Sequence, residues 1–370
     1  MNSKNLIVGR KIKVLLIGCG RISINHLKSI LLKNKDFELI GICDNNINQI
    51  NSAEELIKNF SKEINFNFDI SKIKKFSSED EIYENISSGN LKIDLLVLAT
   101  PSGLHASQSI RAAKHKINIC TEKPMATTWE DGLEMYKACK EAGVLLFVVK
   151  QNRFNSTIDL VRRQVKNGRF GKIGLVTVNV FWQRPQSYYD QDNWRGTWEY
   201  DGGALMNQAS HYVDLLDWMI GPVKTINASI ATIARDIEVE DTAALKIEWK
   251  NGALGTMAVT MITYPKNLEG SITILGDKGT VKIGGKAVNK IEHWEFADKQ
   301  IDDQKIENAS YETSNVYGFG HPLYYQNIIE TFRGTSEPIC TGEEGLKSLE
   351  LLIASYRSAK IKKTINIPLE

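Results

Sequence analysis

"VLLIGCGRIS", residues 14–23, decides the fold class of this 370-residue chain. An apolar run leads directly into Gly18 and Gly20, and a helical pattern follows. Such a glycine pair lets a dinucleotide pyrophosphate approach the backbone at a helix N-terminus. Ser23 stands where the fingerprint has its third glycine, and a small residue can serve there. Alone, the pattern also fits an ordinary tight turn between a strand and a helix.

Around this loop, apolar runs alternate with helical patterns as far as residue 149. The runs are "VLLIG", "FELIGICD", "IDLLVLAT", "INIC" and "VLLFVV". Continuous apolar runs are typical of strands covered on both faces. Their alternation with helices predicts a doubly wound parallel sheet, a Rossmann fold, over residues 1–150.

After residue 150 the pattern changes to long runs that alternate at period two, such as "IGLVTVNVFW" and "DTAALKIEWKNGALGTMAVTM". This pattern predicts an antiparallel sheet with one covered face. We therefore expect an α/β substrate-binding and oligomerisation domain over residues 151–370, with an open antiparallel sheet. Its C-terminal helix and tail, residues 341–370, could pack back on the first domain.

Composition excludes several classes of protein. The net charge of +2 argues against a dedicated nucleic-acid surface, and no apolar run approaches the roughly 20 residues that span a bilayer. Five scattered cysteines form no CxxC pair, and six histidines show no HExxH spacing. Because no apolar signal core precedes the first strand, we expect a cytoplasmic protein without a metal, a nucleic-acid partner or a membrane partner.

The strand that follows the glycine loop ends at Asp44, where an acid can accept hydrogen bonds from the adenosine ribose hydroxyls. A 2′-phosphate would be repelled there, so the sequence predicts NAD rather than NADP as the cofactor. The next strand ends at Thr100 and Pro101, and Glu122 and Lys123 follow another short strand. Ligands bind at such strand ends.

Four motifs give the chain a resemblance to the Gfo/Idh/MocA oxidoreductases. They are Gly18 with Gly20, "ATP" at 99–101, "EKP" at 122–124 and "DGGALMNQASHYVDLL" at 201–216. In that family the EKP lysine lies beside the nicotinamide and the reacting hydroxyl. An aspartate and a histidine four residues apart on a second-domain helix complete the site. Lys123 and His211 match this pattern, whereas Asn207 replaces the aspartate.

The resemblance and the strand ends together define the expected site. The expected catalytic residues are Lys123, His211 and Asn207. The expected cofactor-binding residues are Gly18, Gly20, Arg21, Ile22, Asp44, Thr100, Pro101, His105, Glu122, Lys123 and Gln151. The expected substrate-binding residues are Lys123, Arg153, Tyr188, Trp194, Arg195, Asn207, Gln208, His211, Tyr264, Lys266 and Asn267.

Longer blocks resemble the UDP-N-acetyl-2-amino-2-deoxyglucuronate dehydrogenases within that family. They are "KQNRFN" at 150–155, the stretch at 179–218, "EVEDTAAL" and "MITYPKNLEGSITILGDKGTV". The resemblance implies oxidation of the sugar 3-hydroxyl with NAD, on a route to the diaminated uronic acids of surface polysaccharides such as O-antigen lipopolysaccharide. Arginines at 153, 184 and 195 and Lys266 are candidate partners for a diphosphate and a carboxylate.

The segment "YPKN", residues 264–267, follows a strand, and we expect Tyr264, Lys266 and Asn267 to face the nucleotide sugar. A place at a subunit contact is the alternative. We also expect the second-domain sheet to expose an apolar face, and the family's homo-oligomers, dimers or tetramers, use this sheet.

Removal of the hydroxyl proton needs a base with a pKa near the operating pH. A histidine titrates in this range, whereas a lysine needs its pKa lowered. We therefore assign the base to His211, which shares the proton transfer with Lys123 while Asn207 orients the substrate.

Three alternatives stay open. The substrate could be another nucleotide sugar such as UDP-N-acetylglucosamine, or the sugar could be oxidised only transiently. The chain could also be an NAD-sensing regulator. Whether 2-oxoglutarate recycles a bound cofactor is likewise open.

Overall fold

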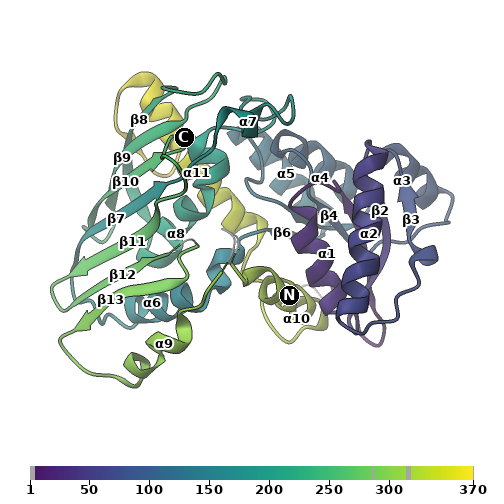
Figure 1. Ribbon diagram of the computed structural model, residues 1–370, viewed down its shortest axis with the longest axis horizontal. Helices are drawn as coiled ribbons and strands as arrows, with labels where there is room; N and C mark the ends of the chain where they lie inside the picture. The colour runs from purple at the N-terminus through teal and green to yellow at the C-terminus, as the bar shows by residue number, and fades with distance from the viewer. Residues whose placement is uncertain (1–4, 286, 314–317, 370) are drawn as a thin grey trace. The chain divides into compact units, whose positions relative to one another are not determined.

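The computed structural model describes residues 5–285, 287–313 and 318–369, and its chain forms two compact units (Figure 1). The first unit comprises residues 1–126, 130–149 and 321–345, and the second comprises residues 127–129, 150–320 and 346–370. Residues 321–345 thus belong to the first unit. We had expected residues 341–370 to pack on the first domain, but residues 346–370 belong to the second unit. Among the described helices, none combines the length and the apolarity needed to cross a bilayer.

The first unit contains a six-stranded parallel sheet with the order β3-β2-β1-β4-β5-β6. Its strands are β1 (Ile12–Ile17), β2 (Phe37–Cys43), β3 (Lys74–Phe76), β4 (Leu95–Leu98), β5 (Asn118–Thr121) and β6 (Leu146–Val148). Its helices are α1 (Ser23–Leu32), α2 (Ile47–Glu63), α3 (Glu79–Ser87), α4 (His105–Lys114), most of α5 (Trp129–Ala142) and most of α10 (Gly320–Arg333). The predicted Rossmann fold is therefore confirmed.

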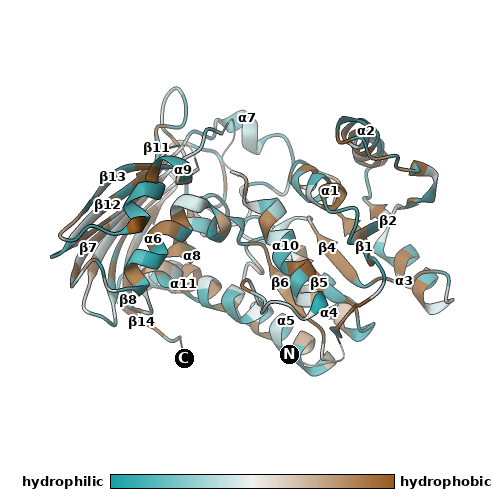
Figure 2. Ribbon diagram, turned by 90° about the horizontal axis from the view of Figure 1, so that it is seen from below, coloured by the Kyte–Doolittle hydropathy of each residue, from teal (hydrophilic) through white to brown (hydrophobic). Residues whose placement is uncertain are grey.

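Two features explain this arrangement. The central strands are apolar along their length because helices cover both faces of the sheet, as Figure 2 shows for β4. β1 pairs with β2 on one side and with β4 on the other, so the strand order reverses at β1. The glycine loop after β1 therefore lies at the position where open α/β sheets bind ligands.

The second unit is built on an eight-stranded sheet with the order β13-β12-β11-β7-β10-β9-β8-β14. Its strands are β7 (Ile173–Phe181), β8 (Val223–Ala231), β9 (Thr242–Trp249), β10 (Leu254–Thr260), β11 (Glu269–Gly276), β12 (Gly279–Gly284), β13 (Lys290–Phe296) and β14 (Ile365–Asn366). Its helices are α6 (Ser156–Lys166), α7 (Gln186–Tyr189), α8 (Ser210–Ile220), α9 (Ile306–Ala309) and most of α11 (Gly342–Ile361).

This sheet corrects one part of the expected fold. It is mixed rather than purely antiparallel, because β10 pairs with β7 in parallel along seven residue pairs, Leu254↔Leu175 to Thr260↔Phe181. The other described pairings of the sheet are antiparallel. A parallel neighbour needs a long crossover, and here α7, α8, β8 and β9 lie between the two strands in the sequence.

The expectation of an exposed apolar face on this sheet stays a prediction. Many of the apolar residues that suggested it, among them Leu245 and Met257, are buried. On the outer face, however, Leu254 of β10 and its pairing partner Leu175 of β7 are 49% and 38% exposed. The nearby Thr256 is also exposed, so the outer face is part apolar and part polar.

A buried ion cluster ties the start of the second unit to α8. Asp214 lies on α8 with its side chain 4% exposed, and its carboxylate oxygens accept hydrogen bonds from Nε (2.8 Å) and Nη2 (2.7 Å) of Arg153. Nζ of Lys150 lies 3.0 Å from the same carboxylate. Burial alone would raise the pKa of Asp214, but the charges of Arg153 and Lys150 lower that pKa to about 2. Arg153 is thus a member of this cluster, and its assignment as a substrate contact stays a prediction.

Replacement of Asp214 by Asn should destabilise the protein by about 3–5 kcal/mol at pH 7, because two buried cations lose their partner. An unfolded aspartate has a pKa of about 3.9, so the carboxylate contributes stability above that pH and loses it as the pH falls toward 2. The difference in unfolding free energy between the wild type and D214N should therefore narrow by about 1 kcal/mol between pH 7 and pH 3. Urea unfolding at the two pH values measures this.

The control is Asp159→Asn, which removes an exposed carboxylate paired with Arg163. That change should cost less than about 1 kcal/mol at pH 7. Equal effects of D159N and D214N would contradict the assigned role of the cluster.

Candidate functional site

The glycine loop has the backbone geometry that a dinucleotide needs. Gly18 has φ +91°, and a Cβ atom there would lie 2.5 Å from the carbonyl oxygen of Ala99, so only glycine fits. At Gly20 a Cβ atom would meet nothing within 4 Å, which leaves this side of the loop open. A hollow of about 350 Å³ adjoins Gly20 and Arg21 and is otherwise lined mainly by α2. The loop therefore fits a pyrophosphate at the start of α1.

Asp44 fastens this loop from the end of β2. Its Oδ2 atom accepts a hydrogen bond from the backbone amide of Cys19 (2.7 Å), and Oδ1 accepts one from the amide of Asn46 (2.8 Å). A carboxylate oxygen can accept more than one hydrogen bond, so ribose hydroxyls can still bind there. Asp44 thus shapes the loop and keeps a negative charge beside it.

His105, an expected cofactor residue, joins two strand-end loops instead of facing outward. It is 1% exposed, its Nδ1 lies 2.8 Å from the carbonyl oxygen of Pro124, and its Nε2 lies 2.9 Å from that of Thr100. Both ring nitrogens therefore contact the backbone. His105 connects the "ATP" loop, which continues through Pro101, to the "EKP" loop.

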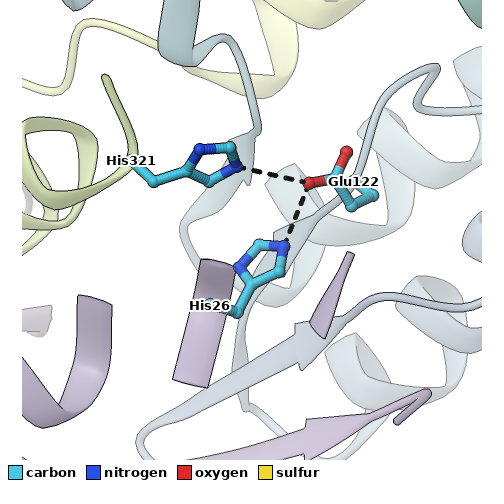
Figure 3. A group of neighbouring side chains, drawn as sticks. All are labelled: His26, Glu122 and His321. Carbon is cyan, nitrogen blue, oxygen red and sulfur yellow. Dashed lines mark hydrogen bonds and ion pairs between the residues drawn. The ribbon is translucent and has the colours of Figure 1, made fainter. Parts of the chain in front are cut away.

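Glu122 is buried directly beside Lys123. Its Oε1 atom lies 3.0 Å from Nε2 of His26, and its Oε2 atom accepts a hydrogen bond from the backbone amide of Lys123 (3.0 Å). Figure 3 shows that His26 and His321 approach the same oxygen of Glu122. Among the described residues, these three side chains form the one group with the composition and spacing to hold a metal ion. Glu122 was expected to contact the cofactor, but in the structure both oxygens bind protein groups.

Asn207 lies on a π-helix, η5 (Ala204–Gln208), that directly precedes α8. Such π turns occur frequently at functional sites. The Nδ2 atom of Asn207 donates a hydrogen bond to Oδ1 of Asp201 (2.5 Å), whose Oδ2 accepts one from the backbone amide of Gly196 (2.8 Å). Asp201 thus orients the amide that replaces the family's aspartate.

His211 lies on the first turn of α8, and its Nε2 lies 3.0 Å from Nε2 of Gln151. An amide nitrogen only donates, so in this arrangement Nε2 of His211 accepts and its proton resides on Nδ1. Gln151, expected to bind the cofactor, is 1% exposed and sets the tautomer of His211 in the second unit.

A basic and aromatic cluster lies near these residues in the second unit, and we call it the arginine–tyrosine cluster. Its members are Arg184, Tyr188, Arg195 and Gln208. Gln208 accepts from Nε of Arg184 (3.0 Å) and donates to the hydroxyl of Tyr188 (3.1 Å), which also accepts from Arg195 (3.1 Å). The cluster brings two guanidinium groups and a phenol into one hydrogen-bonded group, as suits a negatively charged ligand.

The remaining expected substrate residues are arranged in three ways. Trp194 lies under the guanidinium of Arg195, whose Cζ atom is 4.4 Å from the ring centroid. Asn267 accepts a hydrogen bond from the backbone amide of Gln183 (2.8 Å), so it holds its own loop. Tyr264 is 90% exposed, and Lys266 is exposed as well. Their assignment to the substrate stays a prediction.

Sequence reasoning did not select Asp201, His26 or Tyr325. Asp201 holds Asn207, His26 holds Glu122, and Tyr325 in turn holds His26. Asp201 carried a signal, because it begins the family motif at 201–216, six residues before Asn207. His26 and Tyr325 carried none, since His26 is distant in the sequence from both of its partners, Glu122 and Tyr325.

Comparison with known proteins agrees with this geometry. Residues 12–150 match the model of the oxidoreductase family's NAD-binding Rossmann fold, and residues 162–367 match the model of its C-terminal alpha/beta domain. The chain is 28% identical over 62% of its length to 2,7-anhydro-N-acetylneuraminate hydratase of Escherichia coli K12, and it spans 64% of that relative.

Two solved structures cover almost the whole chain. One is the WlbA dehydrogenase of Bordetella pertussis in complex with NADH and UDP-GlcNAcA, with 54% identity, a TM-score of 0.90, and coverage of 98% of this chain and 100% of that one. The other is the WlbA dehydrogenase of Chromobacterium violaceum with the same two ligands, with 51% identity, a TM-score of 0.89, and coverage of 99% and 98%. Since the two family models together match most of the sequence, this chain belongs to the Gfo/Idh/MocA family of oxidoreductases.

Proposed function

We propose that this protein oxidises the 3-hydroxyl of UDP-N-acetyl-2-amino-2-deoxyglucuronate to a ketone with NAD. The observation that carries the proposal is the 54% identity, over nearly the whole chain, to a dehydrogenase solved with NADH and UDP-GlcNAcA, which is the abbreviated name of this uronate. The open side of Gly20 and the acid at Asp44 support NAD as the cofactor. NAD, when bound, accepts the hydride from the sugar carbon.

In this proposal Lys123 and His211 handle the proton of the reacting hydroxyl. Gln151 contacts Nε2 of His211, the acceptor nitrogen, so the reacting hydroxyl would replace Gln151 at this atom when the substrate binds. Asp201 holds the amide of Asn207, which we assign to orienting the sugar. Asn207, at the position where the family has an aspartate, contributes a neutral amide to the proposed site. His211 is the base, and Lys123 shares the transfer.

The arginine–tyrosine cluster is our candidate for the anionic part of the nucleotide sugar. Two guanidinium groups suit a diphosphate or a carboxylate, because their planar forks match both groups. The enzyme would act in the cytoplasm as a homo-oligomer, a dimer or a tetramer, on a route to diaminated uronic acids for surface polysaccharide such as O-antigen. Recycling of the cofactor by 2-oxoglutarate belongs to the same proposal.

Incubation of the protein and stoichiometric NAD with UDP-GlcNAcA should remove two hydrogens from the sugar, while UDP-N-acetylglucosamine should stay unchanged. Mass spectrometry of the sugar measures this, and stoichiometric NAD detects product even when the cofactor stays bound. Conversion of UDP-N-acetylglucosamine alone would support NAD-dependent oxidation of a nucleotide sugar but would show that the uronate is not the substrate. No change in either sugar would favour transient oxidation or an NAD sensor.

Replacement of His211 by Asn should lower kcat for the uronate by about 10²- to 10⁴-fold, because general base catalysis contributes an acceleration of that size. Lys123→Ala should also lower kcat strongly, because the lysine shares the proton transfer. Single-turnover kinetics of NADH formation measures both. If H211N keeps near-full turnover while K123A is inactive, the base is Lys123 and our assignment is wrong.

Replacement of Asp44 by Asn should reduce the preference for NADH over NADPH by about tenfold or more, because a carboxylate repels the 2′-phosphate. Fluorescence titration with the two reduced cofactors gives the ratio of their Kd values. Asp159→Asn is the matched control and should leave the ratio unchanged. A ratio in D44N equal to that of the wild type would show that Asp44 does not select the cofactor.

A further inference from the structure

Three elements of the first unit converge on the carboxylate that precedes Lys123. Glu122 follows β5, His26 lies on α1, and His321 and Tyr325 lie on α10. All four side chains are buried, with Glu122 at 5% and His26 at 0% exposure. Figure 3 shows both imidazole rings turned toward Glu122.

The chemistry of these side chains determines which atom donates in each hydrogen bond between Tyr325, His26 and Glu122. An ionised carboxylate only accepts hydrogen bonds, so Nε2 of His26, 3.0 Å from Oε1 of Glu122, carries the proton. The other ring nitrogen of a neutral imidazole is an acceptor, and Nδ1 of His26 lies 2.6 Å from the hydroxyl of Tyr325. Tyr325 therefore donates to His26, and His26 donates to Glu122.

The far oxygen of the same carboxylate reaches the catalytic loop. Oε2 of Glu122 accepts a hydrogen bond from the backbone amide of Lys123 (3.0 Å). The series of hydrogen bonds therefore extends from Tyr325 to the residue that we assign to proton transfer. Burial alone would raise the pKa of Glu122, but contacts from His26 and His321 and the charge of Lys123 keep that pKa well below its usual value. Glu122 is thus an ionised acceptor for Nε2 of His26 and for the backbone amide of Lys123.

A metal ion is the alternative occupant, since the ligand atoms of His26, Glu122 and His321 lie within 4.8 Å of one another. A metal on Nε2 of His26 would displace the proton that bonds Glu122. The 3.0 Å distance is the length of a direct hydrogen bond, and the hydrogen-bonded arrangement satisfies both nitrogens of His26. The geometry therefore favours a proton over a metal.

We propose that His26 and Tyr325 are positioning residues that, through Glu122, hold the backbone of Lys123 in its working geometry. This inference rests on the proposed function, in which Lys123 takes part in the chemistry. It assigns to α10 an indirect role in the site, because α10 supplies the donor that orients His26.

Two amide variants of His26 separate this role from a merely structural one. The amide nitrogen of glutamine lies near the position of Nε2 in histidine, whereas that of asparagine lies near Nδ1. His26→Gln should therefore keep the donor to Glu122, and His26→Asn should lose it. We expect H26N to lower kcat by about 10- to 100-fold with KM changed less than about threefold, because a small displacement of a catalytic group has effects of this size. H26Q should retain kcat within about threefold of the wild type.

Tyr325→Phe is the second variant, since it removes only the hydroxyl. It should lower kcat by about threefold to tenfold without a change in KM, because His26 loses the donor that orients it. Thermal unfolding of each variant shows whether it is folded.

A readout independent of the substrate accompanies the kinetics. Competitive acetylation of the holoenzyme followed by peptide mass spectrometry gives the reactivity of Lys123 relative to the exposed Lys114. The ratio should change by about threefold or more in H26N and stay near the wild-type value in H26Q. This readout keeps its meaning even if wild-type protein fails to oxidise the uronate, which would overturn the proposed function alone.

Equal kcat and equal acetylation of Lys123 in H26N and H26Q would overturn the inference. A wild-type kcat in Y325F would overturn the role assigned to Tyr325. Stoichiometric metal in the purified protein, bound through His26, would overturn it as well.

Discussion

An ionised carboxylate inside a protein must be matched by donors or positive charge, because its transfer out of water is otherwise prohibitive. Each unit of this chain contains one such carboxylate next to a residue of the proposed chemistry. In the first unit Glu122 precedes Lys123, and in the second unit Asp214 lies three residues after His211. Both have a lowered pKa although they are buried.

The partners that match these charges come from distant parts of each unit, so the fold and the site are built by the same contacts. Asp214 binds Arg153 and Lys150, which lie where the chain enters the second unit. Glu122 binds His26, which Tyr325 holds from α10, a helix that lies between two segments of the second unit in the sequence. Local order at Lys123 and His211 thus depends on the complete fold of each unit.

The sequence predicted what local physics determines. Gly18 and Gly20 were identified because a glycine pair after a strand lets a pyrophosphate approach the backbone, and His211 because it lies in a family motif. Contacts between residues far apart in the sequence could not be predicted from it. Arg153 looked like a surface guanidinium for a ligand, yet its partner Asp214 lies 61 residues away. The parallel pairing of β7 with β10 likewise depends on a crossover that strand patterns do not reveal.

In the proposed reaction hydride leaves C3 of a UDP-linked uronate. The decisive experiment uses UDP-GlcNAcA deuterated at C3, with substrate deuterated at C4 as the control and mass spectrometry of the reduced cofactor as the measurement. Deuterium should move from C3 to NAD, and none should move from C4. Transfer from C4, or unlabelled reduced cofactor from the C3-deuterated sugar, would contradict the proposed reaction.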